Sequence, residues 1–365
     1  MTERFDVAII GAGIAGASMA AFLGPHASVI MLEGEDRPGY HATGRSAAFW
    51  EETYGGPQIL PLTVGSGPYL REHGFLTARG ALNIGREEDR AAVERYYREF
   101  RELGANIEMV GRDRIVEMVP GIRSDWVCGT WGGTCADIDV AAVHAHFLSL
   151  SKQRGVKLRS RARLVAATRE AGGWRLGLAD GSEIKAGIIA NAAGAWASEV
   201  AAMAGAAPIA ISPMRRTVAQ LRTAPAAPDD LPLVLDINDS FYFKPESGRV
   251  WLSPHDETPS PPCDAAPEEI DVAIAIDRME KVVDWRIETV ERKWAGLRSF
   301  SPDRTPVYGF DTRVEGFFWC AGQGGSGIQT SPAGGDMAAS LLLDREAQGP
   351  ARGIDPALYS PARFG

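Results

Sequence analysis

Apolar residues form three short runs that lie far apart in the chain, and each run leads into a glycine-rich turn. The first, Phe5–Ile10, is rich in β-branched residues, which is typical of a buried strand in a parallel sheet. The others are Ile188–Ala193 and Phe317–Ala321. Segments with a helical pattern follow at Ala17–Leu23 and Pro332–Leu343. This order of strands and helices predicts a mixed α/β fold.

The turn after the first run has the spacing of a dinucleotide-binding motif. Gly11 permits a tight turn, Gly13 lets the backbone approach a pyrophosphate, and Gly16 allows close packing of helix on strand. The start of the helix offers free N–H groups to the phosphates. A second apolar run, Ala27–Leu32, ends in Glu33, which could bind the 2′-hydroxyl of an adenosine ribose. The pattern predicts dinucleotide binding, and the alternative is a purely structural turn.

Two further stretches favour FAD over NAD as the dinucleotide. Residues Arg37–Ala48 are rich in glycine and small side chains, at a place where an NAD-binding unit usually continues into a regular sheet. Such residues let backbone amides reach a phosphate or a flavin edge. The late turn Gly322–Ser331 precedes a helix, whose start would stabilise negative charge on a reduced flavin. Three such turns suit a cofactor as long as FAD, whereas NAD would leave two without a role.

In its motifs the sequence resembles the D-amino-acid oxidase superfamily of FAD-dependent oxidoreductases, and within it the bacterial D-arginine dehydrogenases. The resemblance implies a Rossmann-like FAD-binding domain and a second, substrate-binding domain built on a mixed or antiparallel sheet. It runs in order along nearly the whole chain. The matching segments are Gly11–Ser18, Pro38–Ala48, Asn191–Trp196, Ser240–Pro245, Trp294–Phe300, Gly316–Trp319 and Gln323–Ser331.

Together with the turns, the resemblance gives a set of expected cofactor-binding residues. Some members of the superfamily attach FAD through a cysteine in the segment that is here Ser301–Gly309. This segment has no cysteine, so we expect noncovalent FAD. The expected cofactor-binding residues are Gly11, Gly13, Ile14, Ala15, Gly16, Glu33, Gly34, His41, Ala42, Thr43, Gly44, Arg45, Ser46, Ala47, Ala48, Leu164, Ala193, Gly194, Trp196, Gly325, Gly327, Ile328, Gln329 and Thr330.

The resemblance also implies how the chain divides. Two local patterns agree with the division: Asp180-Gly181 is typical of a hairpin turn, and Ser240–Ser253 alternates around a second turn. The expected pieces are residues 1–50, 138–205 and 299–345 for the FAD-binding domain, 51–137 and 206–298 for the substrate-binding domain, and 346–365 for a C-terminal tail.

Arginines within apolar runs indicate a substrate carboxylate, because a guanidinium group can bind a carboxylate through two hydrogen bonds. The chain has Arg215 and Arg216 at the start of a strand pattern and Arg298 in another. Structural ion pairs are the alternative. The flavin is the hydride acceptor in such chemistry, so we expect no histidine base. By resemblance, the expected catalytic residues are Tyr54, Arg216, Tyr242, Arg298 and Gly325, the last through its backbone carbonyl.

The sequence departs from the D-arginine dehydrogenase pattern at two positions. Ala81 stands where that pattern has an acidic residue that binds the guanidinium group, and Phe49 replaces a histidine. Both changes favour a less polar pocket. Glu51 and Glu52 lie in the same loop and could recreate a site for a cation, with exposed loop carboxylates as the alternative.

These observations predict an FAD-dependent oxidoreductase, a D-amino-acid dehydrogenase or oxidase. It would oxidise the Cα–N bond of a small amino acid, with a D-amino acid favoured, to an imino acid by hydride transfer to flavin N5. One alternative is an enzyme that oxidises a secondary amine, of sarcosine or glycine type, or a 2-hydroxy acid. Another is a flavin-bearing subunit without its own activity. The residues do not specify the electron acceptor, whether oxygen, a quinone or another carrier.

Composition and charge exclude several other classes. A net charge of −9 gives no reason to bind nucleic acid. No apolar run approaches the roughly 20 residues that span a bilayer, and the acidic start of the chain does not resemble a signal peptide. The four cysteines have no metal-binding spacing. We therefore expect a cytoplasmic protein without a metal, a monomer whose partners are its small substrate and an electron acceptor.

Overall fold

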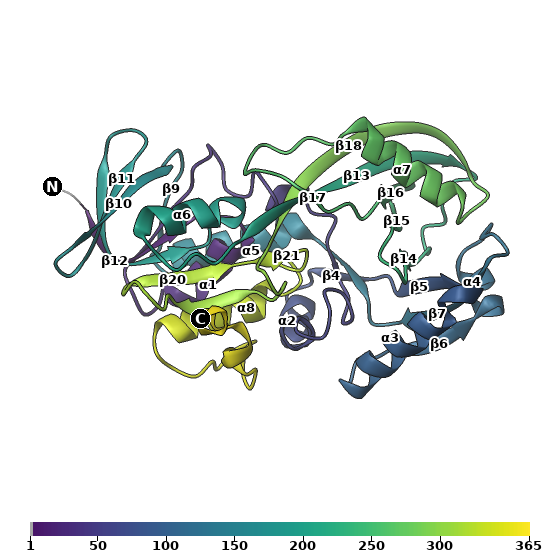
Figure 1. The fold of residues 1–365 in the computed structure, drawn as a ribbon, viewed down its shortest axis with the longest axis horizontal. Helices are drawn as coiled ribbons and strands as arrows, with labels where there is room; N and C mark the ends of the chain where they lie inside the picture. Colours follow the sequence, from purple (N-terminus) through teal and green to yellow (C-terminus); the bar gives the residue numbers. More distant parts are fainter. Residues whose placement is uncertain (1–2) are drawn as a thin grey trace.

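Two large β-sheets organise residues 3–365, the part of the chain that this computed structural model describes (Figure 1). The first sheet has eight strands within these residues. β1 (Arg4–Ile10) lies between β2 (Val29–Leu32) and β12 (Glu183–Asn191), and all three are parallel. The other strands are β9 (Lys157–Arg159), β10 (Leu164–Glu170), β11 (Gly173–Leu178), β19 (Val307–Phe310) and β20 (Phe317–Ala321).

The three apolar runs of the sequence become neighbours in this sheet. β12 pairs in parallel with β1 on one side and with β20 on the other. Their carboxyl ends therefore open at one edge of the sheet, which is where ligands bind in folds of this kind. The glycine turns that follow the three strands meet at that edge.

Helices and a hairpin cover the two faces of the first sheet, because successive strand residues point to opposite sides. Val7 and Ile9 face one core, which α1 (Ile14–Leu23) and α8 (Ser331–Leu342) cover. Ala8 and Ile10 face the other core, which contains residues of β11 and of α6 (Ala197–Ala204). α5 (Val140–Gln153) packs against α1.

The second sheet has ten strands within the described residues and lies on the other side of the molecule (Figure 1). Its longest members, β13 (Ser212–Ala224) and β18 (Arg286–Phe300), form an antiparallel pair that arches across Figure 1. The other strands are β5 (Ala81–Arg86), β6 (Glu108–Gly111), β7 (Trp126–Gly132), β14 (Leu233–Asp236), β15 (Tyr242–Glu246), β16 (Arg249–Ser253), β17 (Thr258–Pro259) and β21 (Gln323–Gly324).

A small third sheet and the remaining helices complete the described chain. The third sheet pairs β8 (Ala136–Ile138) with β3 (Phe49–Trp50) and with β4 (Leu76–Ala78). The other helices are α2 (Leu60–Glu72), α3 (Arg90–Glu102), α4 (Arg112–Met118) and α7 (Glu269–Glu280), and the 3-10 helices are Thr43–Arg45, Glu87–Asp89, Gly194–Trp196, Pro356–Tyr359 and Pro361–Phe364.

The predicted mixed α/β fold is confirmed, with a Rossmann-like parallel core and a second, mostly antiparallel sheet. Both predicted hairpins form, between β11 and β12 and between β15 and β16. The domain boundaries stay a prediction. β21 joins the second sheet although it lies in a range assigned to the FAD-binding domain. The last residues pack on the molecule, where the Tyr359 hydroxyl donates to the carbonyl of Gln58.

Within residues 3–365, none of the helices combines the length and the apolar character that crossing a bilayer requires.

Candidate functional site

The first glycine turn can be built only from glycine at two of its positions. Gly11 has a φ of +98°, and an added Cβ would lie 2.6 Å from the carbonyl oxygen of Ala192. A Cβ on Gly16 would lie 2.0 Å from the carbonyl oxygen of Gly11. Neither distance is possible for real atoms, so both glycines are needed for the approach of α1 to the neighbouring strands. A Cβ on Gly13, by contrast, would lie 3.1 Å from the Thr43 hydroxyl oxygen, which accepts a hydrogen bond from the N–H of Ile14 at the start of the helix.

Glu33 stands at the end of β2, beside this turn. One carboxylate oxygen accepts a hydrogen bond from the N–H of Ala12 at 3.0 Å, and the other accepts from the N–H of Glu35 at 3.0 Å. These two donors fix the orientation of the carboxylate and leave lone pairs free, because each oxygen can accept two bonds. Glu33 can therefore accept a further bond from a ribose hydroxyl.

Four hollows in the described part of the chain lie next to one another in a series, and each shares lining residues with the next. The first hollow lies beyond Glu33, and it shares Gly11, Glu33, His41, Ala193 and Trp196 with the second. The second shares Ala42, Thr43 and Arg45 with the third. The third shares Arg298 and Gly325 with a larger cavity of about 350 Å³. We call the first three hollows the cofactor groove and the last one the substrate cavity.

Most of the expected cofactor-binding residues line the cofactor groove. Its walls include 18 of them: Gly11, Gly13, Ile14, Glu33, Gly34, His41, Ala42, Thr43, Arg45, Ser46, Ala47, Leu164, Ala193, Gly194, Trp196, Gly325, Gly327 and Ile328.

The other expected cofactor-binding residues do not line the groove and instead lie behind it. They are Ala15, Gly16, Gly44, Ala48, Gln329 and Thr330. Gln329 donates to the carbonyl oxygen of Tyr54 and to the Thr63 hydroxyl, so it holds the loop that follows β3. The Thr330 hydroxyl donates to the carbonyl oxygen of Ser326. Both residues shape the site through the backbone segments that they bind.

His41 and Arg45 are tied to neighbouring groups of the protein. His41 pairs with Glu35 at 2.9 Å, and its ring lies 4.6 Å from the ring of Trp196. Arg45 donates to the carbonyl oxygen of Ala265 at 2.7 Å and forms an ion pair with Asp264. Arg45 thereby connects the glycine-rich stretch after β2 to a loop that follows the second sheet's β17.

The register of β13 and β18 places the two predicted arginines on one face. Arg216 lies opposite Gly296, and Arg298 lies opposite Met214. Residues two apart on a strand share a face, so both guanidinium groups point the same way. Arg215 points to the other face, where it pairs with Glu268 and Asp271.

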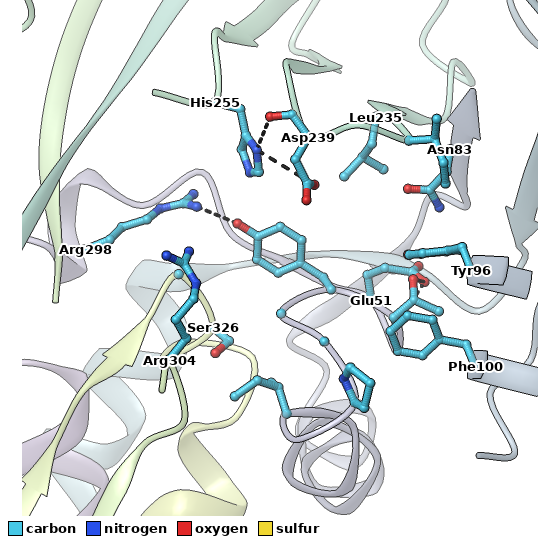
Figure 2. Close-up of a pocket in the computed structure, with 18 of the residues that line it drawn as sticks. Glu51, Asn83, Tyr96, Phe100, Leu235, Asp239, His255, Arg298, Arg304 and Ser326 are labelled. Atoms are coloured by element: carbon cyan, nitrogen blue, oxygen red, sulfur yellow. Dashed lines mark hydrogen bonds and ion pairs between the residues drawn. The ribbon is translucent and has the colours of Figure 1, made fainter. Parts of the chain in front are cut away.

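Tyr54 and Gly325 meet Arg298 at the junction of groove and cavity. Arg298 donates through Nη1 to the Tyr54 hydroxyl (Figure 2). A Cβ on Gly325 would lie 2.8 Å from that Nη1 and 3.0 Å from the Tyr54 oxygen. Tyr242, which is fully buried, lines the groove next to Arg216. The structure thus brings the five predicted catalytic residues together.

Arg216 has a free donor inside the protein. Its side chain is 4% exposed, and it donates to the carbonyl oxygen of Asp256 at 2.7 Å and to Glu257 at 3.1 Å. Within the described residues, its Nη1 has no hydrogen-bond partner. Burial, together with the nearby Arg298, lowers the pKa of Arg216, although a guanidinium group remains charged at neutral pH. Two neighbouring cations with a free N–H group favour an anionic ligand.

His255 is part of the substrate cavity, which the sequence did not predict. Its Nδ1 donates to the carbonyl oxygen of Asp239 at 2.7 Å, and its Nε2 has no partner among the described residues. Burial and the two arginines lower the pKa of His255 to about 2. The imidazole is therefore neutral and presents an acceptor nitrogen. Since His255 lies outside every motif, no sequence signal pointed to it.

The far side of the substrate cavity is formed by other elements. Glu51, Asn83, Tyr96 and Phe100 gather there, away from Arg298 (Figure 2). Phe49 packs beside the cavity with its ring 4.8 Å from the ring of Tyr54.

The sequence left open whether Glu51 and Glu52 form a cation site or are exposed loop carboxylates, and the structure gives the two residues different surroundings. Glu51 lines the cavity, whereas Glu52 accepts hydrogen bonds from the N–H of Asn106 and from the Thr134 hydroxyl. Ala81 is fully buried, and Asn83 of the same strand lines the cavity instead. A cation site made from both glutamates is therefore not what the structure contains.

A model of the FAD dependent oxidoreductase family, DAO, matches residues 6–341 of the chain. The chain belongs to the DAO family. It is an FAD-dependent oxidoreductase, as the sequence predicted, and its cofactor is FAD.

Relatives and solved structures of this enzyme family agree over nearly the whole chain. Glycine oxidase from Geobacillus kaustophilus is 26% identical over 370 residues, which cover 95% of each chain. Its crystal structure has a TM-score of 0.84 at 22% identity, with 98% of each chain covered. The structure of L-proline dehydrogenase from P. horikoshii has a TM-score of 0.86 at 23% identity, covering 100% of this chain and 98% of the other.

A third neighbour is a structure with FAD bound, the dithionite-reduced L-alpha-glycerophosphate oxidase from Mycoplasma pneumoniae. It has a TM-score of 0.85 at 16% identity and covers 93% of this chain and 95% of its own. These structural likenesses concern the fold.

The cofactor groove of this DAO-family enzyme fits FAD. It begins at the carboxylate of Glu33, passes the start of α1 at Gly13, and ends beside Arg298. A dinucleotide needs such an order of contacts: an acceptor for the ribose, free N–H groups for the pyrophosphate and room for a flat ring. Gly296 supplies part of this room, because even a Cβ there would lie 3.4 Å from the Cβ of Arg45.

Cys320 is placed for packing. It is buried at the end of β20, and burial raises its pKa to about 12. A thiol with such a pKa is a weak nucleophile, which supports the expectation of noncovalent FAD.

Proposed function

We propose that this enzyme oxidises the Cα–N bond of a small amino acid, with a D-amino acid favoured, to the imino acid. One observation supports this above the others. Arg298 and the free Nη1 of Arg216 lie on one face of the sheet, at the junction of the cofactor groove with a cavity large enough for an amino acid. Two guanidinium groups beside a flavin site would bind a carboxylate.

The residues of the chain would hold the substrate in one orientation. Arg298 and Arg216 would bind the carboxylate, and the Tyr54 hydroxyl would add a hydrogen bond. The carbonyl oxygen of Gly325 would accept from the substrate amine, and Tyr242 would close the wall. FAD supplies the acceptor for the hydride. This arrangement fixes the direction of the Cα–H bond, and such orientation is a large part of the rate enhancement in bimolecular steps.

The comparisons support chemistry at amino acids but do not select one. Glycine oxidase and L-proline dehydrogenase are among the relatives, and so is an iminodiacetate oxidase from Chelativorans sp. BNC1. The preference for a D-amino acid comes from the resemblance to D-arginine dehydrogenases. A secondary amine or glycine-type substrate is the second candidate, and the 26% identity to a glycine oxidase favours it.

Anaerobic bleaching of the flavin would test the substrate class. The purified protein would be mixed with D-amino acids, L-amino acids, sarcosine, glycine and 2-hydroxy acids, and the oxidised flavin spectrum would be followed. We expect D-amino acids to bleach the flavin fastest. Bleaching by sarcosine or a hydroxy acid but by no D-amino acid would overturn the proposal.

Replacing Arg298 would test the carboxylate site. Arg298→Met removes a guanidinium group that meets Tyr54 and Gly325, and loss of one partner of a buried charge pair costs about 2–5 kcal/mol. We expect kcat/KM to fall about 100-fold or more while FAD remains bound. Arg292→Met is the matched control, because Arg292 lies exposed on the same strand. Equal kinetics of R298M and R292M would remove Arg298 from the site.

The finer expectations of a cytoplasmic location and a monomeric state remain predictions.

A further inference from the structure

The substrate cavity has two chemically different ends. Arg298 and Arg304 lie at one end, and Glu51 lies at the other with Tyr96 and Asn83 (Figure 2). Carboxyl groups outnumber cationic side chains in its lining. Five of the lining residues in the described chain are acidic, Glu51, Glu99, Asp236, Asp239 and Glu257, and two are arginines, Arg298 and Arg304.

At the arginine end of the cavity, charged side chains form ion pairs with one another. Glu257 pairs with Arg304 at 2.7 Å and with Arg216 at 3.1 Å. If Arg298 and Arg216 bind the substrate carboxylate, each of the three arginines at this end has an anionic partner. The acidic end has no such arrangement, because Glu51 has no cationic partner among the described residues.

Glu51 is the most buried of these acids, at 3% exposed. The N–H and the hydroxyl of Thr53 both donate to its Oε1, the hydroxyl at 2.9 Å. Its Oε2 accepts no hydrogen bond from a nitrogen or oxygen donor of the described residues, and the weakly donating thiol of Cys135 lies near the carboxyl group. A buried carboxylate oxygen without a donor is costly, and native proteins rarely leave one without a role.

The surroundings of Glu51 are suited to a longer substrate side chain. Leu235 lies between the two ends and Phe100 lies at the Glu51 end, and both offer apolar surface against which a chain of methylene groups can pack (Figure 2). Asn83 offers an amide and Tyr96 a hydroxyl beside the carboxyl group. Polar groups next to apolar side chains at this end of the cavity would bind a substrate side chain that is apolar along its length and ends in a hydrogen-bond donor.

We propose that Glu51 is the specificity-determining residue of this cavity, and that its free oxygen binds an N–H donor, preferably cationic, at the end of the substrate side chain. This inference rests on the proposed function. It assigns to a residue of the loop after β3 a task that the sequence pattern led us to look for at Ala81 of β5. In this inference Glu51 binds the end of the substrate side chain without help from Glu52.

Selectivity should then depend on the protonation of Glu51. Burial raises the pKa of Glu51 to about 7. Below that pH the group is a neutral acid, and above it the carboxylate attracts a cation. The titratable groups that interact with Glu51 are Glu52, Cys135 and Tyr96, and Glu99, Asp236 and Asp239 line the same cavity.

A pair of substrates of similar length would test the inference. D-lysine carries a terminal ammonium group, and D-norleucine is the same chain with a hydrogen atom in place of that group. In the wild-type holoenzyme we expect kcat/KM for D-lysine to exceed that for D-norleucine by about tenfold or more at pH 8. This ratio should fall as the pH is lowered through 7.

The variant Glu51→Gln keeps the shape of the side chain and its bond to Thr53. It should raise KM for D-lysine about tenfold or more, change KM for D-norleucine less than about twofold, and give a ratio that does not vary with pH. The control is Glu94→Gln, which removes an equal charge from the exposed side of α3 and should behave as the wild type.

Two results would overturn the inference in distinguishable ways. If D-norleucine bleaches the flavin and E51Q changes both substrates equally, the role of Glu51 is wrong and the proposed function stands. If no amino acid of either hand bleaches the flavin, the proposed function fails, and the assignment of Glu51 fails with it.

Discussion

The glycine at position 296 leaves space in the cofactor groove. Gly296 lies opposite Arg216 on the face of the sheet that carries both arginines, and it lines the cofactor groove. Its missing side chain leaves the space between the sheet and the segment Ala42–Arg45 open. A branched side chain there would occupy part of that space, so we expect a larger residue at position 296 to reduce the room for a flat ring beside the arginines.

Glu51 should also make the stability of the protein depend on pH. Below pH 4.5, the ordinary pKa of a glutamate, Glu51 is protonated in both the folded and the unfolded chain. Its ionisation then does not lower the free energy of unfolding. As the pH rises to about 7, the unfolded chain loses the proton first and stability falls. Above pH 7 Glu51 is ionised in both states and the loss of folding stability reaches its full value. A pKa shift of this size corresponds to about 3 kcal/mol.

Glu51→Gln should therefore be more stable than the wild type at pH 8 and similar to it near pH 4.5. Thermal unfolding of the two holoenzymes at both pH values would measure this, with Glu94→Gln as the control for a lost surface charge. An equal difference at both pH values would show that Glu51 does not titrate as the structure indicates.

At the scale of elements, the sequence predicted the strands, helices and hairpins whose formation depends on residues that are neighbours in the chain. The strand at Phe5–Ile10, the helix near Pro332 and the hairpin around Ser247 could be read because their period or turn residues are contiguous in the sequence. The parallel pairing of β14 with β5 could not, since it joins segments about 150 residues apart.

The candidate site divides in the same way. Arg216, Arg298 and the glycine turns could be found from motifs. His255 and Tyr96 could not, because each reaches the cavity only through long-range packing of the element that carries it. Glu51 was recognised as a candidate, but its burial and its separation from Glu52 depend on the fold.

Asp311 holds together the hairpin of β19 and β20. Its Oδ1 accepts from the N–H groups of Arg313 and Val314, and its Oδ2 accepts from the indole of Trp319 and the N–H of Ala207, all at 2.9 Å. Asp311→Ala leaves these donors without a partner, so we expect the free energy of unfolding to fall by about 3 kcal/mol.

Chemical denaturation of the holoenzyme would measure this loss. Asp311→Asn should lose less, because one acceptor remains, and Asp230→Ala at an exposed position should change little. A loss no larger for D311A than for D230A would contradict the role of the buried carboxylate.

At the scale of the whole molecule, the cofactor groove runs from the first sheet to the second. A ligand that lies along it contacts Glu33 at one end and the arginine strands at the other. Binding to the folded state alone adds stability, about 2.7 kcal/mol when the ligand concentration is 100 times Kd. FAD should therefore raise the stability of both sheets together.

Removal of the cofactor would test this. Apoprotein should melt at a lower temperature, and added FAD should restore the melting temperature more completely than FMN, which lacks the adenosine that Glu33 would bind. Heat denaturation should release free FAD into the supernatant. Flavin that stays with the denatured polypeptide would contradict noncovalent binding, and equal rescue by FMN would contradict the role of the Glu33 end.

The register of β13 and β18 makes the position of the two arginines sensitive to insertions, whereas the position of Glu51 does not depend on that register. A slip of one residue in either strand would turn its arginine to the opposite face, so an insertion next to Arg216 or Arg298 would separate the two guanidinium groups, although the pair accommodates two register shifts farther along. Glu51 lies in a loop, where a substitution of its side chain changes no strand register. Selection, or a protein engineer, can therefore alter which molecule enters the cavity while the grip on its carboxylate stays the same.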